Sequence, residues 1–147
     1  MKAKRTDRPA KKILLGILVM MMLFSFASCA KKIKFLTSST VPAAQGYVTV
    51  KRDNNQNYVI KIILSNLAEV KRLQPARSNY VVWMETDKGR TENLGQLNSS
   101  SGFLSKNLKA SMETTSSYKP AKVFITAEDN TNVQYPGNQV ILTTSKF

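Results

Sequence analysis

Cys29 is the residue of this chain with the most chemical options. It follows a long apolar run and the small residues Ala27 and Ser28, and lysines come soon after it. A thiol in this setting is a buried core residue, a reactive nucleophile or a site of covalent attachment. Because the chain has one cysteine and no histidine, intrachain disulfides, CxxC motifs and Cys-His or Ser-His-Asp sites are excluded. Covalent attachment is the chemistry that these residues favour.

The residues before Cys29 have the three-part order of a secretory signal. Residues 1–12 are basic, residues 13–26 carry no charge, and residues 27–29 are small. The apolar run holds 14 residues, and extending it through Ala30 gives 18. A stable spanning helix needs about 20 residues, so we expect a signal helix that is removed, and an uncleaved anchor stays open as the alternative.

Residues 26–29, FASC, resemble a bacterial lipobox. In that motif a peptidase cuts just before the cysteine, and the thiol carries a diacylglycerol. The resemblance implies signal cleavage between Ser28 and Cys29 and attachment of membrane lipid, palmitate included, through Cys29. Phe26 stands where lipoboxes usually have leucine. Ala30 is not aspartate, the residue that retains many proteobacterial lipoproteins at the inner membrane, so the resemblance favours an exported protein of the outer membrane.

Three lysines follow the cysteine closely, at Lys31, Lys32 and Lys34. Two or more acyl chains anchor a protein stably, at about 0.8 kcal/mol per buried CH₂. The lysines would then lie at the headgroups, each gaining on the order of 1 kcal/mol from an anionic surface. They can equally belong to a solvated tether, and both descriptions are compatible.

From Gly46 onward, short runs of β-branched and aromatic residues alternate with turn residues, which is typical of strands. No stretch after Cys29 shows a convincing helical period. The pattern predicts an all-β fold, an immunoglobulin-like antiparallel β-sandwich of about seven strands, with Trp83 in the core between the sheets. The expected strands are residues 47–52, 57–65, 80–86, 90–98, 102–111, 122–128 and 139–144.

Three segments are expected along the chain. Residues 1–28 form a lipoprotein signal peptide, residues 29–45 a lipidated linker, and residues 46–147 the immunoglobulin-like β-sandwich domain. The linker can lend residues 33–36 to a first edge strand.

Several stretches resemble the extracytoplasmic domain of the anti-sigma-K factor family: YVVW at 80–83, NLGQL at 93–97, VFITAED at 123–129 and YPGNQVILTT at 135–144. The resemblance implies the sandwich fold and an exported location. In that family a cytoplasmic helical segment grips the sigma factor and precedes a spanning helix. Only a basic segment of 12 residues precedes the apolar run here, so the resemblance gives no support to sigma-factor binding.

Two sets of oxygen-bearing side chains are candidates for a metal site or for acid–base catalysis. Residues 53–57, DNNQN, match the opening of a calcium loop, but Tyr58 stands where glycine is needed and Leu64 where a bidentate glutamate is needed. A polar hairpin turn is the expected structure, and no metal site is predicted. Glu85 and Glu92 would face each other across a hairpin as a carboxylate pair, although a charged, solvated tip is favoured over catalysis.

The chain is strongly basic, with a formal net charge of +13. Without residues 1–28 it keeps 16 Lys or Arg and 8 Asp or Glu. The basic residues are not interleaved with aromatics and no glycine-rich phosphate loop accompanies them, so nucleic-acid binding is not expected. The positive charge instead favours attraction to a lipid surface or an anionic envelope polymer.

These observations predict a lipid-anchored module of the bacterial cell envelope, with a binding or structural role and no catalytic activity or cofactor. Its partners would be membrane lipid through Cys29 and an envelope protein or anionic envelope polymer. The alternative is a membrane-anchored regulatory domain, similar to an anti-sigma factor but lacking the sigma-binding segment.

Overall fold

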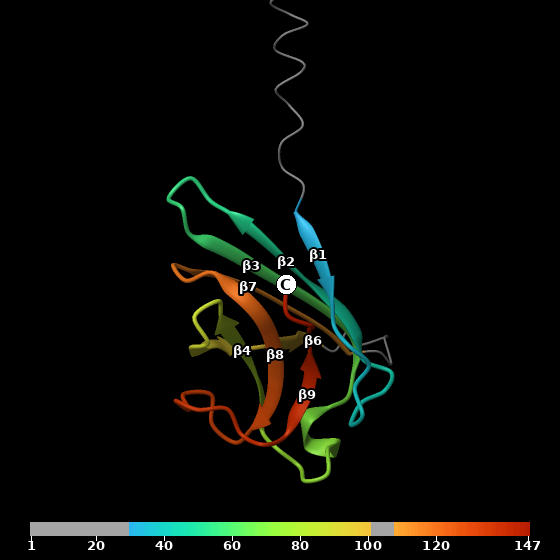
Figure 1. The fold of residues 1–147 in the computed structure, drawn as a ribbon. Coiled ribbons are helices and arrows are strands. Elements are labelled where there is room, and N and C mark those ends of the chain that lie inside the picture. Colours follow the sequence, from blue (N-terminus) through green and yellow to red (C-terminus); the bar gives the residue numbers. More distant parts are fainter. Residues whose placement is uncertain (1–29, 101–107) are drawn as a thin grey trace, which may run out of the picture.

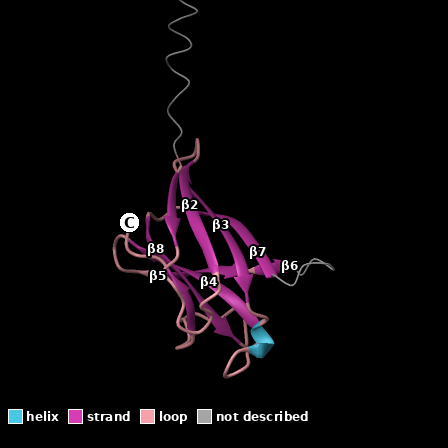
Figure 2. Cartoon of the chain, turned by 90° about the vertical axis from the view of Figure 1, so that its right-hand side faces the viewer, coloured by secondary structure: helices cyan, strands magenta, loops and turns pink. Residues whose placement is uncertain are grey.

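The computed structural model describes residues 30–100 and 108–147, and nearly all of its regular structure is β-strand (Figures 1 and 2). Ser28, Cys29 and the expected signal helix lie outside these ranges. A single turn of 3₁₀ helix, η2 (Val70–Arg72), lies between the third and fourth of the described strands. The described strands are β1 (Lys31–Lys34), β2 (Gln45–Arg52), β3 (Tyr58–Leu67), β4 (Asn79–Thr86), β5 (Thr91–Gln96), β6 (Asn98–Ser100), β7 (Leu108–Ser116), β8 (Pro120–Glu128) and β9 (Val140–Thr143).

The strands form two sheets, and every strand pair is antiparallel. One sheet has the order β1-β2-β3-β7-β6, and the other has the order β5-β4-β8-β9. Taking β2 as strand A, the sheets read A-B-E-D and C-F-G, the order of an immunoglobulin constant-type domain. Strands β1 and β5 extend the two sheets at their edges. The predicted all-β, immunoglobulin-like sandwich is confirmed.

Alternation of side chains along each strand explains how the core forms. In β3, Ile60, Ile62 and Leu64 are buried, whereas Lys61 between them is exposed. In β4, Tyr80, Val82 and Met84 belong to the same core cluster. Because successive strand residues point to opposite faces, these sets define the inner faces of the two sheets. The core therefore lies between the sheets, as the sequence pattern predicts.

The two sheets are also joined along their edges. At one edge the chain passes from β5 directly into β6, and the buried Leu97 between them donates its backbone N–H to the Tyr80 carbonyl at 2.9 Å. At the other edge, Phe35 and Thr144 form an isolated antiparallel bridge, and Leu36 N–H donates to the Thr143 carbonyl at 2.8 Å. These links fix the position of one sheet on the other.

The sandwich begins earlier in the chain than the sequence predicts. Residues 31–34, assigned to the linker, pair with β2 along their whole length. Ile33, Val41 and Ala44 are buried, and Val41 and Ala44 belong to the main core cluster. Small and apolar side chains of the expected linker thus pack on the fold, so little free tether is left between Cys29 and the domain.

Most expected strands differ from the structure by one or two residues at their ends, and two differ by more. The run 90–98 is divided into β5 and β6, because the chain changes sheets at Leu97. The run 102–111 corresponds to β7, which begins at Leu108 and continues through the segment 112–116, expected to be a loop. Residues 101–107 lie outside the described ranges. The polar segment 112–116 becomes strand because it pairs with β3 up to Tyr58.

The expected position of Trp83 in the core between the sheets is wrong. Trp83 is fully buried, but it lies outside the core cluster that holds its neighbours Val82 and Met84. It points to the outer face of the second sheet, where its ring stacks on Phe124 with centroids 6.3 Å apart. The β8–β9 loop is bonded to β5 and β8 on either side of β4, so it passes over this face and buries Trp83 from outside.

Candidate functional site

The predicted basic residues Lys31, Lys32 and Lys34 are exposed and lie in β1, the edge strand of the five-stranded sheet. Lys32 places its ammonium 4.7 Å from the ring centroid of Tyr47. Lysines along an edge strand also discourage pairing with another sheet. The structure therefore gives these lysines a fixed place on the surface. Cys29 and Ser28 lie outside the described residues.

The start of β1 marks one end of the sandwich. Lys31 pairs with Val50, one residue before Lys51 and the β2–β3 turn. Ala30 alone separates Lys31 from Cys29. Two residues of extended chain span about 7 Å, so Cys29 can be no farther than about 7 Å from Lys31 at this end of the domain.

Three turns lie at this same end by the antiparallel order of the strands, and the β7–β8 turn is bonded to each of the other two. The connections at the tips of β2 and β3 and of β7 and β8 can be followed in Figure 1. Between the β7–β8 and β2–β3 turns, the Ser117 hydroxyl donates to Asn57 Oδ1 at 3.3 Å. Between the β4–β5 and β7–β8 turns, Asp87 N–H donates to the Lys119 carbonyl at 3.1 Å. We call Lys31 together with residues 51–57, 86–90 and 117–120 the N-terminal end of the sandwich.

The N-terminal end is basic and its cations are exposed. Its segments contain only two acidic residues, Asp53 and Asp87. Five of its exposed basic residues form no ion pair with any described residue: Lys31, Lys51, Arg52, Lys88 and Lys119.

The opposite end, formed by residues 68–78 and 129–139, is different. Its two arginines, Arg72 and Arg77, are paired with Glu69 and Asp129, and Lys71 is its one basic residue without an ion pair to a described residue. Among the described residues, the N-terminal end therefore has more unpaired cations than the opposite end.

Two arginines of the N-terminal end lie over tyrosine rings. The Arg52 guanidinium carbon lies 5.0 Å from the ring centroid of Tyr58, and the same guanidinium donates to the Tyr58 hydroxyl at 2.9 Å. Arg90 lies 5.2 Å from the ring centroid of Tyr118 and 3.3 Å from a carboxylate oxygen of Glu92. Tyr118 is 45% exposed. Tyrosine and arginine in such pairs suit a boundary between water and lipid headgroups.

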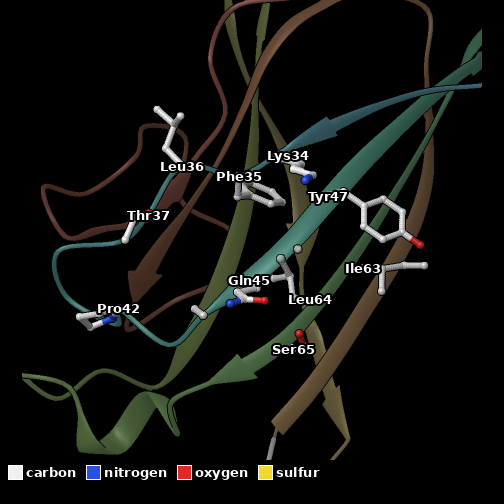
Figure 3. A pocket seen from close by; sticks show the side chains of 12 residues that line it. Lys34, Phe35, Leu36, Thr37, Pro42, Gln45, Tyr47, Ile63, Leu64 and Ser65 are labelled. Atoms are coloured by element: carbon white, nitrogen blue, oxygen red, sulfur yellow. The ribbon is translucent and has the colours of Figure 1, made fainter.

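An open groove of about 510 Å³ lies where β1 and its following loop meet β2 and β3 (Figure 3). Leu64 and Ile63 line it from β3, and Lys34 is the one charged residue among its lining residues. In the wall of the groove, β2 approaches β3 closely at Gly46, where a Cβ would be 2.3 Å from the Ile63 carbonyl oxygen. It offers apolar contact and one cation, without a pair of groups for acid–base chemistry.

The possible calcium loop is a hairpin turn, as expected. Both Asn55 N–H and Asn57 N–H donate to the same carboxylate oxygen of Asp53, each at 2.8 Å. The carboxylate thus closes the turn. No group of three or more Asp, Glu, Cys or His side chains that could hold a metal ion occurs within residues 30–100 and 108–147.

Glu85 and Glu92 do not face each other. The register of β4 and β5 pairs Met84 with Glu92 and Thr91 with Glu85. Glu85 and Glu92 are therefore one position out of step, and their side chains lie on opposite faces of the sheet.

The Glu85 carboxylate is held by basic residues. The Lys146 ammonium, hydrogen-bonded to it at 2.8 Å, lowers the pKa of Glu85 below its ordinary value, and the charge of Lys122 adds to this effect. A carboxyl group whose pKa is lowered in this way is ionised at neutral pH and is a poor general acid.

A buried polar network that the sequence analysis missed lies on the outer face of the second sheet. Trp83 Nε1–H donates to the Thr126 hydroxyl at 2.8 Å, and this hydroxyl donates to Glu128 Oε1 at 2.6 Å. The same carboxylate oxygen accepts from Gly137 N–H at 2.7 Å. A signal was present in the sequence, since a carboxylate that ends an otherwise apolar strand must find donors.

The network of Trp83, Thr126, Glu128 and Gly137 is structural rather than chemical. In the described part of the chain, no buried side-chain nitrogen or oxygen lacks a hydrogen-bond partner. Every donor of the network is used within the protein, and the network fixes the β8–β9 loop over Trp83.

Comparisons of the chain with protein-family models, curated proteins and solved structures find no match in any of the three. The resemblances to a lipobox and to the anti-sigma-K factor domain therefore stay predictions. The described ranges include no helix with the length and apolar character needed to cross a bilayer. The apolar run at residues 13–26 lies outside those ranges.

Proposed function

We propose that this protein is a lipid-anchored, non-catalytic immunoglobulin-like module of a bacterial cell envelope, exported and held at the outer membrane through Cys29. One observation carries the proposal: an independently packed β-sandwich starts two residues after the cysteine that ends a signal-like segment. A signal peptide followed at once by a folded domain is the arrangement that an anchored module needs. The excess of exposed basic residues supports attraction to an anionic surface.

The structure supports a binding or structural role over catalysis. Glu85 and Glu92, the carboxylate pair considered from the sequence, lie on opposite faces of the sheet, and Glu85 forms an ion pair with Lys146. The buried carboxylate of Glu128 accepts hydrogen bonds from Thr126 in β8 and from Gly137 in the β8–β9 loop, both at Oε1. The groove beside β1 is open and offers polar and apolar contact in similar measure, which suits the docking of an envelope protein or polymer.

Metabolic labelling with palmitate in a bacterial host tests the anchor. We expect the wild-type protein to incorporate the label and to begin at Cys29. Cys29→Ser should abolish the label and leave the signal uncleaved, because the thiol that carries the diacylglycerol is gone. Ser25→Ala changes a neighbouring small residue and should keep both label and cleavage.

Mass spectrometry of the N-terminus decides between the two anchoring modes. A lipid-modified Cys29 at the new N-terminus agrees with the proposal. An intact N-terminus that begins at Met1 would favour the alternative, an uncleaved anchor with a short basic tail. Labelling and cleavage of the Cys29→Ser protein at the wild-type level would overturn the proposal.

A further inference from the structure

We propose that the N-terminal end of the sandwich is a contact surface for an anionic lipid bilayer, so that the anchored domain is held in one orientation. This inference rests on the proposed lipidation of Cys29. It adds a second membrane contact, made by turns that are far apart in the sequence, and it states which end of the domain faces away from the membrane.

The short connection to Cys29 is the first argument. The strand β1 pairs with β2 from Lys31 onward, so only Ala30 lies between the paired residues and the cysteine. A cysteine whose acyl chains lie in the bilayer would hold the start of β1 about 7 Å from the anchored residue. Electrostatic screening in physiological salt acts over about 8 Å, so Lys31 at the start of β1 would interact with the headgroups.

The distribution of charge is the second argument. Lys51 lies near the end of β2, and Lys88 and Lys119 lie in the β4–β5 and β7–β8 turns. All three are exposed, and none pairs with a described acidic residue. Each basic residue near an anionic surface strengthens membrane attachment about fivefold. At the opposite end the arginines are already paired, so the N-terminal end is the more favourable contact.

The aromatic residues are the third argument. Tyr118 projects from the β7–β8 turn and is 45% exposed beside Arg90. An exposed tyrosine next to a guanidinium fits the headgroup region, where the ring contacts lipid and the hydroxyl stays in water. With this end on the membrane, the β8–β9 loop, which contains Tyr135 with 81% of its surface exposed, would face away from the membrane toward other envelope components.

Lysine acylation with a water-soluble amine reagent tests the orientation on the whole processed protein. The protein is reconstituted in vesicles of phosphatidylcholine with 30 mol% phosphatidylglycerol, or of phosphatidylcholine alone, and labelling rates are read by mass spectrometry. We expect Lys51, Lys88 and Lys119 to react at least threefold more slowly in the anionic vesicles, and the protection to disappear in 0.5 M salt. Lys71 and Lys109, exposed and near the other end, should react equally in both.

A matched pair of variants tests the charge directly. The double variant Lys51→Gln, Lys119→Gln should lower the equilibrium constant for contact of the N-terminal end with the anionic bilayer about 25-fold, since each residue contributes about fivefold. Lys88 of this variant should then be acylated as fast in anionic vesicles as in neutral ones. Lys71→Gln with Lys109→Gln removes the same charge from elsewhere and should leave Lys88 protected.

Equal labelling at both ends of an anchored protein, in both kinds of vesicle, would overturn the orientation while leaving the anchor intact. The peptide containing Cys29 is read in the same digest. If that cysteine carries no lipid, the proposed function fails, and this inference fails with it.

Discussion

Replacing Thr126 by valine should destabilise the sandwich more than its size suggests. The two side chains have nearly the same shape, so packing is retained. The hydroxyl, however, accepts from Trp83 Nε1–H and donates to Glu128 Oε1. The substitution leaves the indole N–H without an acceptor, and both Trp83 and Thr126 are fully buried. It also removes one donor from a carboxylate that has few others.

The expected loss can be estimated from these two contacts. An unsatisfied buried donor costs about 1–3 kcal/mol, and a hydrogen bond to a charged group contributes about 1.5–3 kcal/mol. Because the two contacts share one hydroxyl, they are not additive, and we expect a decrease of about 3 kcal/mol in the free energy of unfolding. For a domain of this size that corresponds to a fall of roughly 10–15 °C in the melting temperature.

Thermal unfolding of the detergent-solubilised full chain measures this loss. Trp83 is the one tryptophan of the protein, so its fluorescence reports on the network, and circular dichroism reports on the sheets. Thr115→Val is the matched control, since Thr115 is exposed in β7. A Thr126→Val protein within about 0.5 kcal/mol of the wild type, the range of ordinary surface changes, would refute the structural role of the network.

Three further outcomes follow from single contacts. Burial raises the pKa of Tyr80 from 10.0 to about 12. The free energy of unfolding is therefore unaffected by Tyr80 ionisation below pH 10 and decreases as the pH rises toward 12, by at most about 2.7 kcal/mol. Tyr80→Phe also loses the hydrogen bond to the Ala68 carbonyl, about 1 kcal/mol, but should show less alkaline loss in urea unfolding at pH 9 and pH 11; equal alkaline losses would contradict this. Because the pKa of Glu85 is lowered, the stability that its ionised form contributes is present above pH 4.5 and is lost as the pH falls through the lowered pKa. Glu85→Gln should therefore reduce the difference in unfolding free energy between pH 7 and pH 3. An unchanged difference would count against the contact with Lys146. Gly46→Ala would place a Cβ 2.3 Å from a backbone carbonyl oxygen and should lower the free energy of unfolding by about 1–3 kcal/mol. Wild-type stability of this variant in urea would show that the close approach of β2 and β3 is not needed.

The class of fold could be predicted because the strand signals are local. The alternation in Ile60, Lys61 and Ile62, and the turn residues between the runs, indicate strands without knowledge of their partners. The division of residues 90–98 into β5 and β6 could not be predicted in the same way. It depends on Leu97 being buried between two sheets, which is a property of their packing.

The position of Trp83 shows a limit of sequence patterns. Every residue from Tyr80 to Met84 is apolar, so the alternation that identifies the inner face of a half-buried strand is missing. Both faces of β4 are in fact buried, one by the other sheet and one under the β8–β9 loop. The network with Glu128 could not be predicted either, because it depends on that loop returning to place Gly137 beside the carboxylate.

The basic character of the N-terminal end of the sandwich could not be predicted from the sequence, because it depends on the topology of the strands. Lys51, Lys88 and Lys119 are separated by more than thirty residues each, and in the sequence they read as scattered surface charge. In a chain of antiparallel strands, alternate connections lie at the same end, provided that β5 and β6 are taken as one strand that changes sheets. The β2–β3, β4–β5 and β7–β8 turns then share the end at which β1 starts, and the β3–β4 and β8–β9 loops share the other. The antiparallel order of strands therefore places Lys51, Lys88 and Lys119 at the same end of the domain as the residue proposed to carry the lipid.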